Sequence, residues 1–125
     1  MFSINSDYSI YLTRGDIASI EIGARKSETE DYIFQIGDVV RFRVFEKKRC
    51  DNVVLQKDVK VDEETDRVVI NLDRSDTKLG ELIHKPKEYW YEIELNPDTT
   101  PQTIIGYDAD GPKILMLFPE GDDKL

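Results

Sequence analysis

The sequence contains very little cysteine and histidine. Its 125 residues include one cysteine, Cys50, and one histidine, His84. A single cysteine excludes an internal disulfide, and so few thiol and imidazole groups do not support a zinc site. No motif links the two residues as a nucleophile and its base. We therefore predict no catalytic residue and no cofactor, and a function other than that of an enzyme.

The sequence also lacks a long hydrophobic run. No apolar stretch is long enough to cross a bilayer, and residues 1–9 show no basic-then-apolar signal pattern. We therefore expect the chain to be made in the cytoplasm and, at least at first, kept there. Acidic residues outnumber basic ones by 26 to 17, which leaves a formal net charge of −9. Nucleic acids and anionic membranes repel such a chain, so neither is an expected partner.

What the sequence has is alternation of apolar and polar residues. A chain of this length suits one domain, and we predict a single domain over residues 1–125, with a core at about 8–119 and a frayed tail at 120–125. The period of two predicts about eight strands, and their spacing is typical of an all-β sandwich. The polar stretch 23–31 is interpreted as a loop. Alternation is present at residues 8–12, 18–22, 68–72 and 87–95, and it is clearest at 39–44.

Two pairs of strands look like hairpins. The runs 53–61 and 68–72 flank a short acidic turn, and the runs 102–107 and 113–118 flank Asp108-Ala109-Asp110-Gly111. Asp-Gly is favourable chemistry for a hairpin turn. We therefore expect each pair to be hydrogen-bonded.

Residues 73–79 show no alternation. Asp73 or Ser75 is suited to cap a single helical turn, and Gly80 is suited to end it. We expect one short helical turn here.

Three consecutive aromatic residues, Tyr89-Trp90-Tyr91, occupy one predicted strand. Because side chains alternate between the faces of a strand, Tyr89 and Tyr91 share the core face and Trp90 points the other way. Trp90 is then either an interface anchor or a side chain that a neighbouring loop covers.

The last two strands add apolar residues that we place off the core face. They are Ile105, Leu115 and Leu117. An exposed apolar stripe usually marks a protein interface. With Trp90, these residues form the predicted contact surface.

A group of basic residues lies in the first half of the chain: Arg41, Arg43, Lys47, Lys48 and Arg49. Arg41 and Arg43 share one face of a strand. We favour a solvated strand face that nearby acidic residues balance. The alternative is a patch on which Arg41 and Arg43 select an acidic partner surface.

Asp108 and Asp110 have the alternate spacing of oxygen ligands for calcium, with Gly111 for the turn. The glutamate that completes a full calcium-binding loop is absent. We favour a plain hairpin turn, with calcium as the alternative.

Several segments together resemble a known family. They are Tyr11-Leu12-Thr13-Arg14-Gly15-Asp16, Phe34-Gln35-Ile36-Gly37-Asp38 with the strand that follows, Val69-Ile70-Asn71-Leu72, Asp76-Thr77-Lys78, Tyr89-Trp90-Tyr91-Glu92-Ile93-Glu94-Leu95, Gln102-Thr103-Ile104-Ile105 and Leu117-Phe118-Pro119-Glu120-Gly121. Their order resembles small phage and prophage proteins of Gram-positive bacteria, which are similar to the N-terminal domain of the siphophage upper baseplate protein.

The resemblance covers roughly residues 8–121 and implies an immunoglobulin-like antiparallel sandwich. It also implies a structural role in tail or baseplate assembly, with the virion as a second location and no catalytic residues. The expected partners are other tail or baseplate subunits, or the chain itself as a homo-oligomer. The alternative function is a calcium- or carbohydrate-linked binding module, in which Asp108 and Asp110 hold the ion and Trp90 stacks on a sugar.

Overall fold

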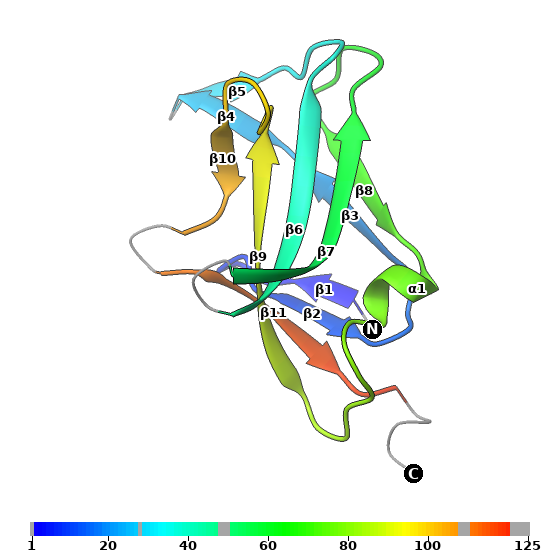
Figure 1. Cartoon of the computed structure of the whole chain (residues 1–125). Coiled ribbons are helices and arrows are strands. Elements are labelled where there is room, and N and C mark those ends of the chain that lie inside the picture. Colours follow the sequence, from blue (N-terminus) through cyan, green and yellow to red (C-terminus); the bar gives the residue numbers. More distant parts are fainter. Residues whose placement is uncertain (1, 28, 48–50, 108–110, 121–125) are drawn as a thin grey trace.

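The computed structural model describes residues 2–27, 29–47, 51–107 and 111–120 of the chain. In these residues it shows eleven strands and one helical turn, which form an all-β sandwich (Figure 1). The elements in chain order are β1 (Phe2–Ile4), β2 (Ile10–Thr13), β3 (Ala18–Ile22), β4 (Ala24–Ser27), β5 (Glu30–Tyr32), β6 (Val39–Lys47), β7 (Asp51–Lys60), β8 (Val68–Leu72), α1 (Arg74–Thr77), β9 (Lys87–Leu95), β10 (Gln102–Ile105) and β11 (Lys113–Phe118).

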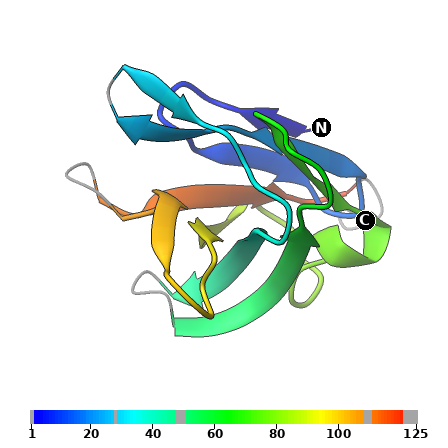
Figure 2. The ribbon, with the colours of Figure 1, turned by 90° about the horizontal axis from the view of Figure 1, so that it is seen from above.

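One layer is a seven-stranded sheet in the order β1-β2-β11-β9-β6-β7, with β10 paired to the remaining part of β9. Its pairs are antiparallel except for the parallel pair of β11 and β2. The second layer contains the pairs β3–β8 and β4–β5. Seen from above, the large sheet curves so that β6 and β7 lie across the interior from β3 and β8 (Figure 2).

A single hydrophobic core fills the space between the layers. Alternate residues of β6 and β9 enter it from the large sheet, and those of β3 and β8 enter it from the other layer. This is the pattern that period-two alternation predicts for strands with one buried face, and it confirms the predicted all-β sandwich. Representative fully buried side chains are Ile20, Phe34, Phe42, Ile70 and Ile93.

Both predicted hairpins are wrong. β7 pairs with β6 and β8 pairs with β3, so the runs 53–61 and 68–72 belong to different sheets. β10 pairs with β9, and β11 lies between β9 and β2. Strand partners are chosen by burial across the whole sandwich, and adjacency along the chain does not decide them.

The stretch interpreted as a loop, 23–31, contains most of the β4–β5 hairpin, and β1 adds a strand before the predicted core. These short elements explain why the chain has more strands than the predicted number of about eight. β4 carries few apolar residues and most of its side chains are exposed, so it gives no alternation for a sequence pattern to detect.

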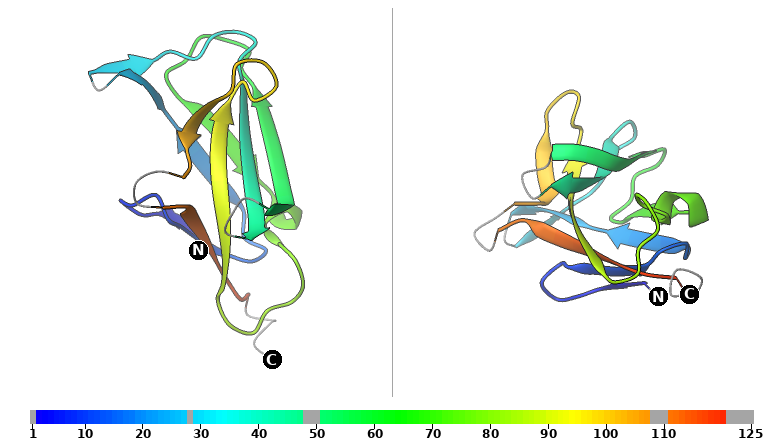
Figure 3. Two further views of the ribbon diagram at one scale, coloured as in Figure 1. Left: turned by 60° about the vertical axis from the view of Figure 1, so that its left-hand side comes forward. Right: turned by 60° about the horizontal axis from the view of Figure 1, so that its bottom comes forward.

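The predicted helical turn is confirmed as α1, but it ends at Thr77 with Lys78 as its C-cap, so the expected end at Gly80 is wrong. Its N-cap is Asp73, whose carboxylate accepts a hydrogen bond from the Asp76 N–H at 2.9 Å, while the Asp76 carboxylate accepts from the Asp73 N–H at 3.0 Å. This reciprocal capping box satisfies two backbone donors that a helix leaves unpaired. α1 closes one end of the sandwich beside β8 (Figure 3).

The segment Thr13-Arg14-Gly15-Asp16 clasps this end. The buried Thr77 hydroxyl accepts a hydrogen bond from the Gly15 N–H at 3.0 Å and donates to the Asp16 carbonyl oxygen at 2.8 Å. Gly15 has φ +86°, a conformation that suits glycine. The Arg14 guanidinium pairs with the Glu120 carboxylate at 3.1 Å. The segment therefore ties the end of β2 to α1 and to the end of β11.

Two further expectations were a frayed C-terminal tail and the absence of a membrane-spanning segment. Glu120 is anchored through Arg14, whereas the rest of the predicted frayed tail, 121–125, lies outside the described residues. Among the described residues no helix is long and apolar enough to span a membrane.

Candidate functional site

Trp90 lies on the outer face of the large sheet. Its neighbours Tyr89 and Tyr91 are buried in the core, whereas Trp90 is half-buried. This confirms the predicted facing of the three aromatic residues. In the sheet Trp90 is directly opposite Phe45 on β6 and Ile114 on β11, and directly paired residues share a face. Phe45 is fully buried but stands outside the core cluster, which places it beneath the outer surface next to Trp90.

The apolar surface continues from Trp90 across β11 to β2. Met116 and Phe118 share the face of Ile114, and the Phe118 ring meets Tyr11 edge-on with 5.5 Å between centroids. Tyr11 is 39 % exposed and the β11 residues are half-buried. We call this surface the outer apolar stripe; it consists of Tyr11, Trp90, Ile114, Met116 and Phe118, and the buried Phe45 lies beneath it.

The predicted exposure of Leu115 and Leu117 is wrong. Leu115 is 1 % exposed and Leu117 is 0 % exposed, and both belong to the core. β11 is inserted between β9 and β2, and this register sets Leu115 opposite the core residues Tyr89 and Ile10. Ile105, the third residue of the predicted stripe, is half-buried and packs against the core.

The sequence pattern predicts the wrong face for Leu115 and Leu117, because β11 is apolar on both faces. Lys113 shares its parity with Leu115 and Leu117, so a polar residue marks that face as the solvent side in the sequence, yet Lys113 is 7 % exposed. Ile114, Met116 and Phe118, which carry the outer face, were therefore missed. No local signal separates the two faces of such a run; only the neighbouring strands do.

Arg41 and Arg43 lie on the same outer face, beside the stripe, and both are paired. Arg41 binds Asp58 through Nε and Nη2 at 2.9 and 3.0 Å and also contacts Asp98 at 3.1 Å. These carboxylates raise the pKa of Arg41. The pairs fit the favoured interpretation of a strand face that nearby acidic residues balance. The docking of an acidic partner on Arg41 and Arg43 stays a prediction.

Arg43 connects this charged area to the stripe. Its Nη2 contacts Glu92 at 2.8 Å and Glu94 at 2.5 Å, and its guanidinium lies over the Phe45 ring at 5.5 Å. Burial and the neighbouring Glu94 raise the pKa of Glu92, against the effect of Arg43. The three side chains form a border along one side of the apolar surface, in which one cation partly compensates two carboxylates.

The other candidate chemistries gain no support. Asp108 and Asp110, the proposed calcium ligands, and Cys50, Lys48 and Arg49 lie outside the described residues. In the described ranges no group of three histidine, cysteine, aspartate or glutamate side chains is placed to hold a metal ion. His84 is exposed in the segment between α1 and β9.

Comparison of the chain with protein-family models, with curated proteins and with solved structures gave no match.

Proposed function

We propose that this chain is a non-enzymatic structural module of phage or prophage origin, which assembles through its outer apolar stripe with a second copy of itself. The stripe is the observation that carries the proposal. It joins aromatic and aliphatic side chains from three strands, β2, β9 and β11, on one face of the large sheet.

The composition of the stripe suits a protein interface. Aromatic residues and methionine are enriched at the centres of interfaces, and charged residues are depleted there. Trp90 lies between Phe45 and Ile114, a position in which a partner can desolvate it fully, as binding hot spots require. An isologous contact places the same patch of each copy in the interface.

The charged border is compatible with a second copy as the partner. A net charge of −9 opposes self-association at long range. Beside the stripe, however, Arg43 compensates much of the charge of Glu92 and Glu94. This compensation lowers the repulsion between two copies beside the stripe. Glu88, directly opposite Met116 in the ladder, adds an exposed carboxylate to the same face.

The resemblance supports the setting, a phage tail or baseplate, and the virion as a second location. The segments that carry it include the Thr13–Asp16 clasp and the strand Tyr89–Leu95. These segments maintain the fold and orient Trp90 outward, which suits a module whose role is to hold a contact surface.

The test is the molar mass in solution, measured by light scattering at several concentrations. We expect the wild-type chain to self-associate, and Trp90→Ser and Met116→Ser each to shift the mass towards that of the monomer. The matched control is Val69→Ser, which removes an exposed apolar side chain from β8, in the other layer. Equal melting temperatures establish that the variants are folded.

Two outcomes contradict the proposal. A wild-type chain that is monomeric at every concentration removes self-assembly through the stripe. An oligomer that Val69→Ser weakens as much as Trp90→Ser does places the contact elsewhere.

A further inference from the structure

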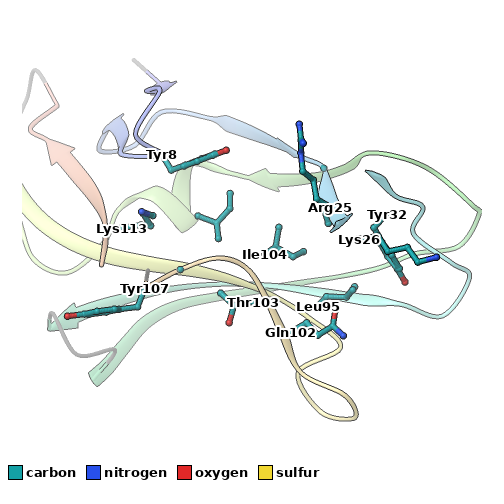
Figure 4. A pocket seen from close by; sticks show the side chains of 14 residues that line it. Tyr8, Arg25, Lys26, Tyr32, Leu95, Gln102, Thr103, Ile104, Tyr107 and Lys113 are labelled. Atoms are coloured by element: carbon teal, nitrogen blue, oxygen red, sulfur yellow. The ribbon is translucent and has the colours of Figure 1, made fainter. Parts of the chain in front are cut away.

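A cleft of about 760 Å³ opens between the two layers at the edge formed by β4 and β10. This volume lies within the range of ligand-binding clefts. Figure 4 shows Arg25, Lys26 and Tyr32 on one side, Leu95, Gln102 and Thr103 on the other, and Ile104 directed into the space between them. None of the residues of the outer apolar stripe lines this cleft.

The cleft is bordered by strand edges. Four consecutive residues of β10, 102–105, and three of β4, 24–26, line it. Because alternate side chains of a strand point to opposite faces, a cavity that touches consecutive residues meets the side of the strand, where backbone N–H and C=O groups lie. In the described part of the chain β10 is paired only with β9, and β4 only with β5. Each strand thus presents one edge without a ladder partner.

The chemistry of the lining is distinct from that of the whole molecule. Arg25, Lys26 and Lys113 contribute to it, and no described aspartate or glutamate does, in a chain whose net charge is −9. The pair of Lys26 with Glu30 spans 3.8 Å, and both side chains are about two-thirds exposed. Such a pair is weak, and a carboxylate from a ligand can replace it.

The apolar and aromatic lining completes a surface for a peptide. Leu95, Ile104 and Ile105 line the space between the edges, and Tyr8 and Tyr107 lie towards one end (Figure 4). The Tyr91 hydroxyl donates to the Tyr8 carbonyl oxygen, which fixes the turn that carries the Tyr8 side chain.

We propose that this cleft binds an extended acidic segment of a partner protein, which adds as a strand to the free edge of β10. Main-chain hydrogen bonds to the edge supply affinity in this mode of recognition, and side-chain pockets supply specificity. The cations Arg25 and Lys26, across the cleft, select acidic side chains, while Ile104 receives an apolar one. This contact goes beyond the proposed self-assembly, because it uses a different surface and a different partner.

The register of β10 limits what is bound. Its ladder with β9 shifts between Thr103 and Ile105, and a bulge of this kind interrupts flat pairing along an edge. The edge therefore accepts a short strand and disfavours the unlimited stacking of further copies. Pro101, immediately before β10, removes one N–H donor at the start of the edge.

The first experiment uses fluorescence anisotropy with a labelled eight-residue peptide that alternates glutamate and valine. We expect saturable binding with a Kd below about 1 mM. Two controls have the same length and pattern. One carries lysine in place of glutamate, and the other is the glutamate peptide with N-methyl groups on alternate backbone nitrogens. We expect both controls to bind at least about tenfold more weakly, because one loses the charge complementarity and the other loses the main-chain hydrogen bonds.

The second experiment locates the site. Arg25→Glu/Lys26→Glu should weaken binding about tenfold or more, whereas Lys60→Glu/Lys85→Glu, with the same change in net charge at exposed positions outside the cleft, should weaken it less than about threefold. Hydrogen exchange should slow at the amides of residues 102–105 when the glutamate peptide is present.

Three results overturn the proposal. They are no binding of the glutamate peptide at 1 mM or below, equal binding of the N-methylated peptide, and equal loss of binding in the two charge-reversed variants. Equal binding of the N-methylated peptide identifies a polyanion site in place of strand addition. Because Trp90→Ser does not alter the cleft, it should bind the peptide as the wild type does, which separates this test from that of self-assembly.

Discussion

Asp38 is the residue whose replacement tests the fold most directly. Its carboxylate accepts hydrogen bonds from the Tyr32 hydroxyl at 2.6 Å, the Gln35 N–H at 2.9 Å and the Asn96 side-chain amide at 3.1 Å. These donors belong to β5, to the turn before β6 and to the end of β9. One side chain therefore ties the β4–β5 hairpin to the large sheet.

The expected loss in the free energy of unfolding follows from these contacts. A hydrogen bond to a charged group contributes about 1.5–3 kcal/mol, and partial exposure of both side chains lowers that figure through solvent screening. We expect Asp38→Ala to lower the free energy of unfolding by about 2–4 kcal/mol. Tyr32→Phe should lower it by about 1–2 kcal/mol. In the double-mutant cycle of Tyr32→Phe with Asp38→Asn, the coupling energy should be about 1 kcal/mol.

The Tyr32–Asp38 pair also predicts that the stability of the fold depends on pH, at high pH through Tyr32 and at low pH through Asp38. The hydrogen bond to Asp38, then burial, raises the pKa of Tyr32 from 10.0 to about 12. The resulting stabilisation is complete below pH 10.0 and is lost as the pH rises through about 12. Burial works to raise the pKa of Asp38, but the hydrogen bonds from Tyr32, Gln35 and Asn96 outweigh it and lower that pKa below 3.8. The stabilisation from Asp38 is therefore lost as the pH falls below 3.8.

The assays are urea unfolding for the cycle and NMR titration of ring-labelled tyrosine for the pKa. In Asp38→Asn the pKa of Tyr32 should return towards 10.0. Asn96→Ala is a control for the pKa of Tyr32 alone: it leaves the contact of Asp38 with Tyr32, while it removes one donor from Asp38, the acceptor of the Val39 N–H and a residue suited to φ +50°. An unchanged pKa of Tyr32 in Asp38→Asn, or a coupling energy near zero, would refute the reasoning.

Three further predictions concern stability and are measured by urea unfolding. Thr77→Val leaves the backbone of the β2–β3 turn without its hydroxyl partner and should cost about 2–3 kcal/mol; a loss as large in Thr77→Ser would contradict this reason. Leu115→Ala should cost about 2–5 kcal/mol, because it empties part of the core, whereas Met116→Ala on the opposite face should cost about 1 kcal/mol or less; the reverse order would refute the assignment of faces. Gly80→Ala should cost about 1–3 kcal/mol, because φ is +62° and an added Cβ would lie 2.8 Å from the Tyr89 hydroxyl oxygen; an unchanged midpoint would contradict this geometry.

The sequence predicted the strands that bury one face. Val40, Phe42 and Val44 alternate in the sequence and are buried in the structure, because a period of two is imposed locally by the pleat of the strand. Asp73 was likewise one of two N-cap candidates that the sequence offered, with Ser75, since capping depends on residues within one turn.

Strand pairing was not predictable in this way. The chain order favours β7 with β8 and β10 with β11, but β8 pairs with β3 and β11 pairs with β2 and β9. The local alternation of a strand is equally compatible with several partners. Which ladders form depends on closing one core between residues far apart in the chain.

In the candidate site, too, some features follow from the sequence pattern and others depend on the neighbouring strands. Alternation alone places Trp90 opposite Tyr89 and Tyr91, and the structure agrees. In β11 both faces are apolar, so the period could not decide between Leu115 and Met116. The neighbours β2 and β9 decide it, because they bring core residues alongside Leu115.

The sequence by itself determined a small acidic β domain with Trp90 on the outer side of its strand, because composition and period-two alternation are local properties. Only the tertiary structure decided which face of β11 is exposed and that the edges of β4 and β10 border one cleft. β4 and β10 are separated by most of the chain, and no pattern within either strand records the other. Their proximity is a consequence of how the two layers pack around the shared core.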